Sequence, residues 1–152
     1  MNKFKKIIKM LIIILLPLIG GFLSTIFVNF KIYNNLNKPV LSPPKIVFPI
    51  AWSILYIIIG ISLYYVNKDS YNKKITKIII VNLLLNYIWT VIFFKFNLYI
   101  VAAIDLLLLI VSTVTLICEL YKENKKIGIS EIPYLLWLLF AFYLNLGIVF
   151  LN

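Results

Sequence analysis

The sequence predicts an all-α membrane protein, a bundle of five transmembrane helices, and three observations support this fold class. Hydrophobic residues make up 63% of the 152 residues, and the mean hydropathy of +1.04 is too high for a soluble domain of this size. Five apolar stretches each reach the roughly 20 residues that a helix needs to cross a bilayer. The lysines lie between those stretches. We therefore expect residues 1–152 to form a single membrane domain.

Each of the five stretches is expected to form one helix. The expected ranges are about 7–28, 47–66, 75–94, 98–118 and 133–151. A basic start followed by Leu11 also resembles a secretory signal, but the apolar run continues past Pro17 to Val28 without a convincing small-residue cleavage site. We expect this stretch to be retained as the first helix.

The net charge of +10 comes from 15 lysines against 5 acidic residues. In a soluble protein such a charge would suggest nucleic acid as a partner. Here eleven lysines belong to the N-terminus and the second and fourth loops, and four to the first and third loops. The positive-inside rule then predicts a multi-pass protein of the cell membrane with a cytoplasmic N-terminus and the C-terminus on the opposite side. The partner is the lipid bilayer, and no nucleic acid is expected.

Residues that support metal or hydrolytic chemistry are scarce. The chain has no histidine and one cysteine, Cys118, so we expect no metal site, no internal disulfide and no ordinary axial haem ligation. No phosphate loop, catalytic triad or carboxylate pair is present. Asp105 is the only acid well inside an expected helix. It is either a functional group or a structural tether, paired with Lys95 or a loop lysine.

The first loop, residues 29–46, is long for a compact bundle. Its prolines Pro39, Pro43 and Pro44 fix φ and favour extended backbone in the residues before them. Long loops in compact domains often act as lids over a site. We expect this loop to be a lid, with a plain connector as the alternative.

Three of the expected helices carry aromatic and amide side chains on one face. Spacings of three or four residues place such side chains on one stripe. The stripes are Phe48, Trp52 and Tyr56; Asn82, Asn86, Trp89 and Phe93; and Trp137, Ala141 and Asn145. The rings alternatively form an interfacial belt, and the asparagines alternatively bond neighbouring helices.

Depth along the helices predicts a cavity under the first loop, between the second, third and fifth helices. At a rise of about 1.5 Å per residue, most members of the stripes lie in the half nearest that loop. Trp137 is the exception. Its expected axial distance from Trp52 is on the order of 15 Å, so the two indoles should not share one ligand face.

Several motifs, in order along nearly the whole chain, resemble the translocator protein family of tryptophan-rich sensory proteins. This family (TspO/MBR) includes the relatives of the peripheral-type benzodiazepine receptor, and the chain resembles its bacterial members. The matching segments are 36–39 (LNKP), 42–44 (SPP), 48–56 (FPIAWSILY), 85–94 (LNYIWTVIFF), 133–145 (PYLLWLLFAFYLN) and the final Asn152.

The resemblance implies a five-helix bundle, commonly a homodimer, with a ligand pocket closed by the first loop. Family members bind porphyrins and, in many cases, sterols and benzodiazepine-type drugs. Combined with the stripes, the motifs give a set of candidate ligand-binding residues. They are Pro43, Pro44, Phe48, Trp52, Tyr56, Asn86, Trp89, Phe93, Trp137, Ala141 and Asn145.

The expected function is that of a porphyrin-binding (tetrapyrrole-binding) membrane receptor or regulator that requires no further cofactor. One alternative is an enzyme that degrades bound porphyrin in light and oxygen, as some members are reported to do, with Trp52 and Trp137 as catalytic residues. A transporter of porphyrins or other apolar ligands ranks last.

Three departures from the family pattern limit what carries over. Ile32 replaces a lid tryptophan, and Asn82 is shorter than the glutamine often found there. No basic residue follows Lys126, so cholesterol binding is not carried over.

Overall fold

The computed structural model describes residues 3–26, 28–69 and 72–152, and within them every regular element is a helix. Five helices are long and apolar enough to cross a membrane. The elements are α1 (Lys3–Ser24), α2 (Ile32–Asn35), α3 (Val47–Asn67), α4 (Lys73–Phe94), α5 (Tyr99–Glu123), α6 (Lys125–Ser130) and α7 (Ile132–Leu151). The predicted fold class, a five-helix transmembrane bundle, is confirmed.

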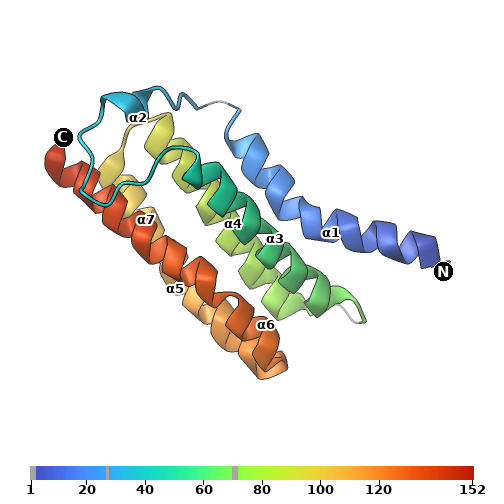
Figure 1. Ribbon diagram of the computed structural model, residues 1–152. Coiled ribbons are helices and arrows are strands. Elements are labelled where there is room, and N and C mark those ends of the chain that lie inside the picture. Colours follow the sequence, from blue (N-terminus) through green and yellow to red (C-terminus); the bar gives the residue numbers. More distant parts are fainter. Residues whose placement is uncertain (1–2, 27, 70–71) are drawn as a thin grey trace.

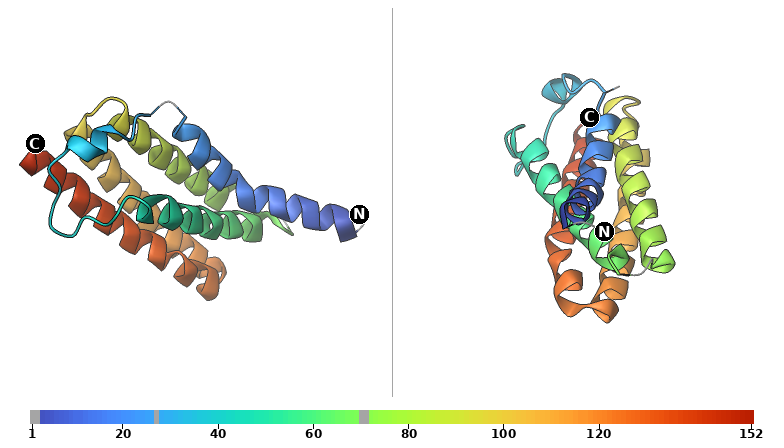
Figure 2. Two further views of the ribbon diagram at one scale, coloured as in Figure 1. Left: turned by 45° about the horizontal axis from the view of Figure 1, so that its top comes forward. Right: turned by 90° about the vertical axis from the view of Figure 1, so that its right-hand side faces the viewer.

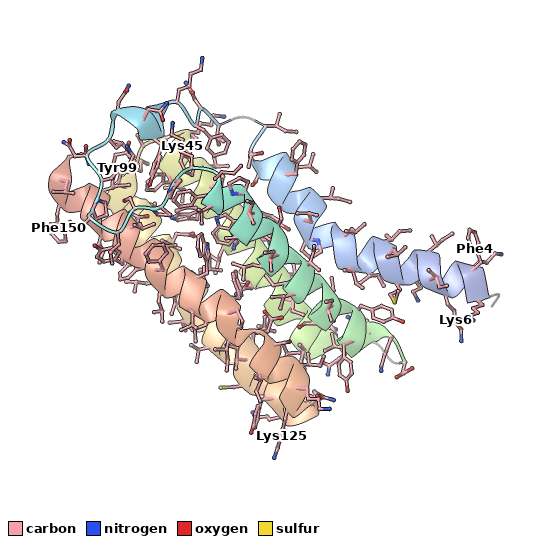
Figure 3. All side chains as sticks on the ribbon, in the orientation of Figure 1. Phe4, Lys6, Lys45, Tyr99, Lys125 and Phe150 are labelled. Atoms are coloured by element: carbon pink, nitrogen blue, oxygen red, sulfur yellow. The ribbon has the colours of Figure 1, made fainter. Side chains whose placement is uncertain are left out.

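The chain passes back and forth between two ends of the bundle (Figure 1). The first loop with α2, the α4–α5 connection and the C-terminus lie at one end, and the N-terminus, the α3–α4 connection and α6 lie at the other. In Figure 3, Lys45 marks the first end, and Lys6 and Lys125 belong to the second. The lysine-rich connections therefore share one end, as expected. Which end faces the cytoplasm stays a prediction.

Helix α1 leans away from the other four toward its N-terminus (Figures 1 and 2). It spans Lys3–Ser24 instead of the expected 7–28, in which residue 27 lies outside the described residues. Glycines allow the close contact: a Cβ on Gly60 of α3 would collide with the Ile14 carbonyl of α1, and one on Gly21 would collide with the Tyr56 ring. Helices α1 and α3 consequently pack backbone to backbone.

Two short helices, α2 and α6, lie outside the expected ranges. Asn124 caps α6, since its Oδ1 accepts hydrogen bonds from the backbone N–H groups of Lys126 (2.9 Å) and Ile127 (3.3 Å). Asn72 caps α4 in the same way by accepting from the Ile75 N–H at 3.1 Å. These side chains satisfy N–H groups that a helix start leaves without partners.

The first loop is fastened to the C-terminal end of α7. The Asn37 N–H donates to Asn152 Oδ1 at 2.9 Å, and Asn152 Nδ2 donates to the Asn37 carbonyl at 3.0 Å. Two residues further on, the Pro39 ring lies where a Cβ on Gly147 would be. The loop thus runs back along α7 before α3 begins, and the start of α3 lies beside the middle of α7 (Figure 1).

Candidate functional site

A cavity of about 430 Å³ lies between α1, α3, α4 and the first loop. Its lining is almost entirely apolar and aromatic, and Lys45 is the one charged residue among the described residues that line it. The lining consists of Leu18, Gly21, Phe22, Thr25, Phe30, Tyr33, Lys45, Phe48, Pro49, Trp52, Ser53, Tyr56, Trp89, Thr90 and Phe94. A volume of this size is within the range of about 300–1,000 Å³ that is usual for small-molecule sites.

Trp52 is the centre of the aromatic cluster behind this cavity. Its ring stacks on Tyr56 with a centroid distance of 5.7 Å and an interplanar angle of 28°. It also contacts Trp89 at 6.2 Å and Trp137 at 6.3 Å. Separations of this kind are typical of favourable aromatic pairs. Trp52 therefore contacts both of the other indoles of the chain.

The expected depth of Trp137 is wrong. Instead of being about 15 Å away along the bundle axis, its ring stands edge-on to Trp52 at 86° and also contacts Phe48 at 6.1 Å. The reason is the course of the first loop. Because the loop returns along α7 from Asn152 past Gly147 before α3 begins, the first turns of α3 are level with the middle of α7.

The serine and threonine hydroxyl groups that line the cavity are bonded to carbonyl groups three or four residues earlier in the chain, whereas the buried Tyr33 hydroxyl has no hydrogen-bond partner among the described residues. Thr25 Oγ1 donates to the Phe22 carbonyl at 2.7 Å, Ser53 Oγ to the Pro49 carbonyl at 2.7 Å, and Thr90 Oγ1 to the Asn86 carbonyl at 3.4 Å. Each of these serine and threonine hydroxyls satisfies its donor without a ligand. The wall accordingly presents mainly rings and methyl groups to whatever binds.

A chain of buried hydrogen bonds leads from the cavity wall into the bundle. Tyr56 Oη donates to Asn86 Oδ1 at 2.7 Å, and Asn86 Nδ2 donates to Tyr134 Oη at 3.0 Å. Tyr134 Oη in turn donates to Asn82 Oδ1 at 2.9 Å, and Asn82 Nδ2 donates to Thr113 Oγ1 at 2.8 Å. The bonds connect α3, α4, α5 and α7. Asn86 is thus a link between helices, one of the two roles that the sequence left open.

Asn145 has a similar bonding role. Its Oδ1 accepts from Trp89 Nε1 at 3.1 Å, and its Nδ2 donates to the Tyr99 carbonyl at 2.8 Å. Together with Phe93 and Ala141 it borders a second space of only about 20 Å³ on the α7 side of Trp89. That space is too small for more than one or two water molecules.

The predicted site residues separate into three groups. Those that line the larger cavity are Phe48, Trp52, Tyr56 and Trp89. Those that border only the small space are Phe93, Ala141 and Asn145. Those that line neither are Pro43, Pro44, Asn86 and Trp137.

Sequence reasoning missed the wall that α1 contributes. The wall is formed by Leu18, Gly21 and Phe22 of α1 and by Thr25 directly after it, in place of the α7 residues expected there. Of these only Gly21 carries a signal that local sequence could supply, because a glycine in an apolar helix permits close helix contact. In the first loop, Lys45 reaches the cavity while Pro43 and Pro44 do not.

Asp105 is buried, with 7% of its surface exposed, and its Oδ2 has no hydrogen-bond partner among the described residues. The ion pairs found in the described part of the chain instead join Lys68 to Asp69, and Lys74 and Lys122 to Glu119. Asp105 lines neither cavity, so it is not part of this site.

The fold and the site together define the class of protein. It is a five-helix membrane protein with an aromatic cavity next to its first loop. The sequence profile of the TspO/MBR family matches residues 13–151. The chain belongs to this family.

Individual relatives agree with the assignment. The chain is similar to a tryptophan-rich protein TspO from Archaeoglobus fulgidus, 30% identical over 151 residues, which cover 96% of this chain and 98% of that protein. A tryptophan-rich protein TspO from Chlorobaculum tepidum is 32% identical over 124 residues, covering 79% and 78%. A translocator protein from Bos taurus is 30% identical over 139 residues, covering 86% and 82%.

Proposed function

We propose that this protein is a membrane receptor or regulator that binds a porphyrin in the cavity between α1, α3, α4 and the first loop. The observation that carries the proposal is the apolar cavity of about 430 Å³ with Trp52 and Trp89 in its wall and Lys45 as the one charged residue in the described part of its lining. A flat apolar ring system with acidic substituents matches this arrangement. Its ring would pack against the indoles, and Lys45 would pair with a propionate.

The experiment is a titration of the detergent-purified protein with protoporphyrin, followed through the absorbance of the porphyrin so that the signal does not depend on tryptophan. Trp52→Phe should weaken binding about fivefold, because it removes roughly 1 kcal/mol of ring contact. Trp137→Phe should have a smaller effect, since Trp137 supports Trp52 without lining the cavity. Unchanged affinity in Trp52→Phe and in Trp89→Phe would contradict the proposed site.

A second candidate function, light- and oxygen-dependent degradation of the bound porphyrin, is favoured by the mutual contacts of the indoles. Trp52 touches both Trp89 and Trp137, so an indole oxidised beside the ligand has neighbouring rings to share the charge. Illumination under oxygen separates the two functions. A receptor leaves the porphyrin spectrum as stable as that of free porphyrin, whereas an enzyme accelerates its loss and Trp52→Phe slows that loss.

The membrane orientation and the oligomer are proposals as well. We expect the lysine-rich end to face the cytoplasm, which labelling of Lys6→Cys in a Cys118→Ala background tests from each side of sealed cells. We expect a homodimer, which light scattering on the detergent-solubilised protein tests.

A further inference from the structure

The cavity reaches the surface on one side of the bundle, between the C-terminal half of α1 and the start of α3. Phe22 of α1 lines the cavity and is nevertheless 71% exposed. Pro49 in the first turn of α3 and Phe30 in the first loop also line it and are exposed. Residues that both line a cavity and are exposed mark its mouth. This mouth is bordered mainly by apolar side chains, with Lys45 of the first loop beside them.

The end of the bundle that carries the first loop is closed more firmly. The reciprocal hydrogen bonds of Asn37 and Asn152 fasten the loop to α7. Tyr33, in α2, is 7% exposed, and its ring contacts Phe48 at 5.7 Å and Phe94 at 6.3 Å. A ligand that came from this end would have to break these contacts.

The hydroxyls near the mouth are suited to a lipid environment. An unsatisfied polar group is costly in hydrocarbon, whereas a hydroxyl bonded to its own helix is tolerated. Thr25, directly after α1, and Ser53, in α3, flank the mouth and are both bonded to carbonyl groups of these helices. Lys45 is exposed beside them, and a long lysine side chain can place its charge at the headgroup level.

We propose that ligands enter and leave this cavity sideways, from the bilayer between α1 and α3, and that Phe22 is the side chain that gates the passage. The ligand of this proposal is that of the proposed function, on which it rests. The opening of the cavity to lipid does not depend on a bound ligand. Acyl chains should therefore reach the mouth even when no porphyrin is present.

The first experiment tests the opening without any ligand. A variant with Trp52 as its only tryptophan, Trp89→Phe with Trp137→Phe, is reconstituted into vesicles of brominated or ordinary phosphatidylcholine. Brominated acyl chains should quench Trp52 strongly and aqueous iodide only weakly, and Phe22→Ala should increase the lipid quenching. The matched control retains only Trp89, which is 7% exposed and should be quenched less. Stronger quenching of Trp52 by iodide than by lipid would overturn the proposal.

The second experiment compares the two routes by the association rate of protoporphyrin with vesicle-reconstituted protein. Phe22→Ala should raise the association rate at least about threefold, and Phe22→Trp should lower it. Val40→Trp, on the outside of the first loop with 97% of its surface exposed, is the control and should change nothing. Asn152→Ala removes both hydrogen bonds that its side chain makes to the Asn37 main chain, and it should leave the rate unchanged. A faster rate in Asn152→Ala with no change in Phe22→Ala would place access at the loop.

The proposed porphyrin binding and the proposed lateral access can be refuted independently of each other. Absence of saturable porphyrin binding in folded protein would end the proposed function, while lipid quenching of Trp52 would still decide whether the cavity opens to the bilayer. Saturable binding with rates that do not depend on residue 22 would leave the function standing and refute lateral access.

Discussion

Replacing Asn86 by leucine tests whether the buried asparagine holds helices together or contacts ligand. The amide lies behind Tyr56, outside both cavities, and makes two side-chain hydrogen bonds, to Tyr56 Oη at 2.7 Å and Tyr134 Oη at 3.0 Å. Leucine has a similar volume and no polar atoms. The substitution therefore removes both bonds and creates little empty space.

The expected loss of stability follows from these bonds. Hydrogen bonds between membrane helices contribute about 0.6 kcal/mol each on average, so two contribute about 1.2 kcal/mol. Tyr134 Oη keeps its bond to Asn82 Oδ1 at 2.9 Å, but the buried Tyr56 hydroxyl loses its acceptor. An unsatisfied buried hydroxyl costs roughly 1 kcal/mol more. Asn86→Leu should thus lower the free energy of unfolding by about 2 kcal/mol.

A double-mutant cycle makes the test specific. In the natural background Tyr56→Phe should cost about 1.6 kcal/mol, because it removes one bond and leaves the buried Asn86 Oδ1 without a donor. In the Asn86→Leu background it should be neutral or stabilising, because it removes the hydroxyl that has lost its partner. Reversible unfolding in mixed detergent micelles measures all four proteins. Ser53→Ala, whose hydroxyl bonds only to its own helix, is the control with little expected effect.

Two results would refute this reasoning. One is a Tyr56→Phe cost that is the same in both backgrounds, which would mean that the two side chains are not coupled. The other is an Asn86→Leu protein of natural stability that has lost porphyrin affinity more than about tenfold, which would mean that the amide contacts ligand.

Three further predictions concern the close contacts around the cavity. Gly60→Ala should destabilise the protein by about 2 kcal/mol or more in the same unfolding assay, since its methyl group would collide with the Ile14 backbone carbonyl. Gly147→Ala should lower the free energy of unfolding less, because its methyl group meets the Pro39 ring and a side chain can shift. Asn152→Ala removes both side-chain bonds to the Asn37 main chain, so it should make the first loop more susceptible to limited proteolysis with only about 1 kcal/mol lost in stability. Equal protease resistance would contradict the fastening to α7. Lys45→Gln should weaken porphyrin binding and reduce its dependence on salt, and an unchanged salt dependence would exclude an ion pair at the mouth.

The number of helices and their approximate ranges could be predicted because the bilayer demands about 20 apolar residues per helix, wherever that helix sits. The ends were less accurate. Helix α1 begins at Lys3 and ends at Ser24, and α5 continues to Glu123, beyond the expected 118. Terminal turns depend on caps and on local packing, which hydropathy does not report.

The aromatic members of the site could be found from local spacing. Phe48, Trp52 and Tyr56 recur every four residues, so one helix face must carry all three, and the structure places all three in the wall of the larger cavity. The alternative roles of an amide could not be separated in this way. Asn86 shares a face with Trp89, yet only the positions of Tyr56 and Tyr134 on other helices show that its hydrogen bonds are already used.

By itself the sequence determined the class of protein, the five membrane helices, the lysine-rich end and the aromatic rings available for a ligand. Each of these follows from composition or from residue spacing within one helix. Only the tertiary structure decided which helices enclose the cavity and that Trp137 meets Trp52. Those outcomes depend on how far each helix is shifted along its neighbours. Here the shift is set by the first loop, which Asn152 and Gly147 hold against α7 through contacts between residues more than a hundred positions apart.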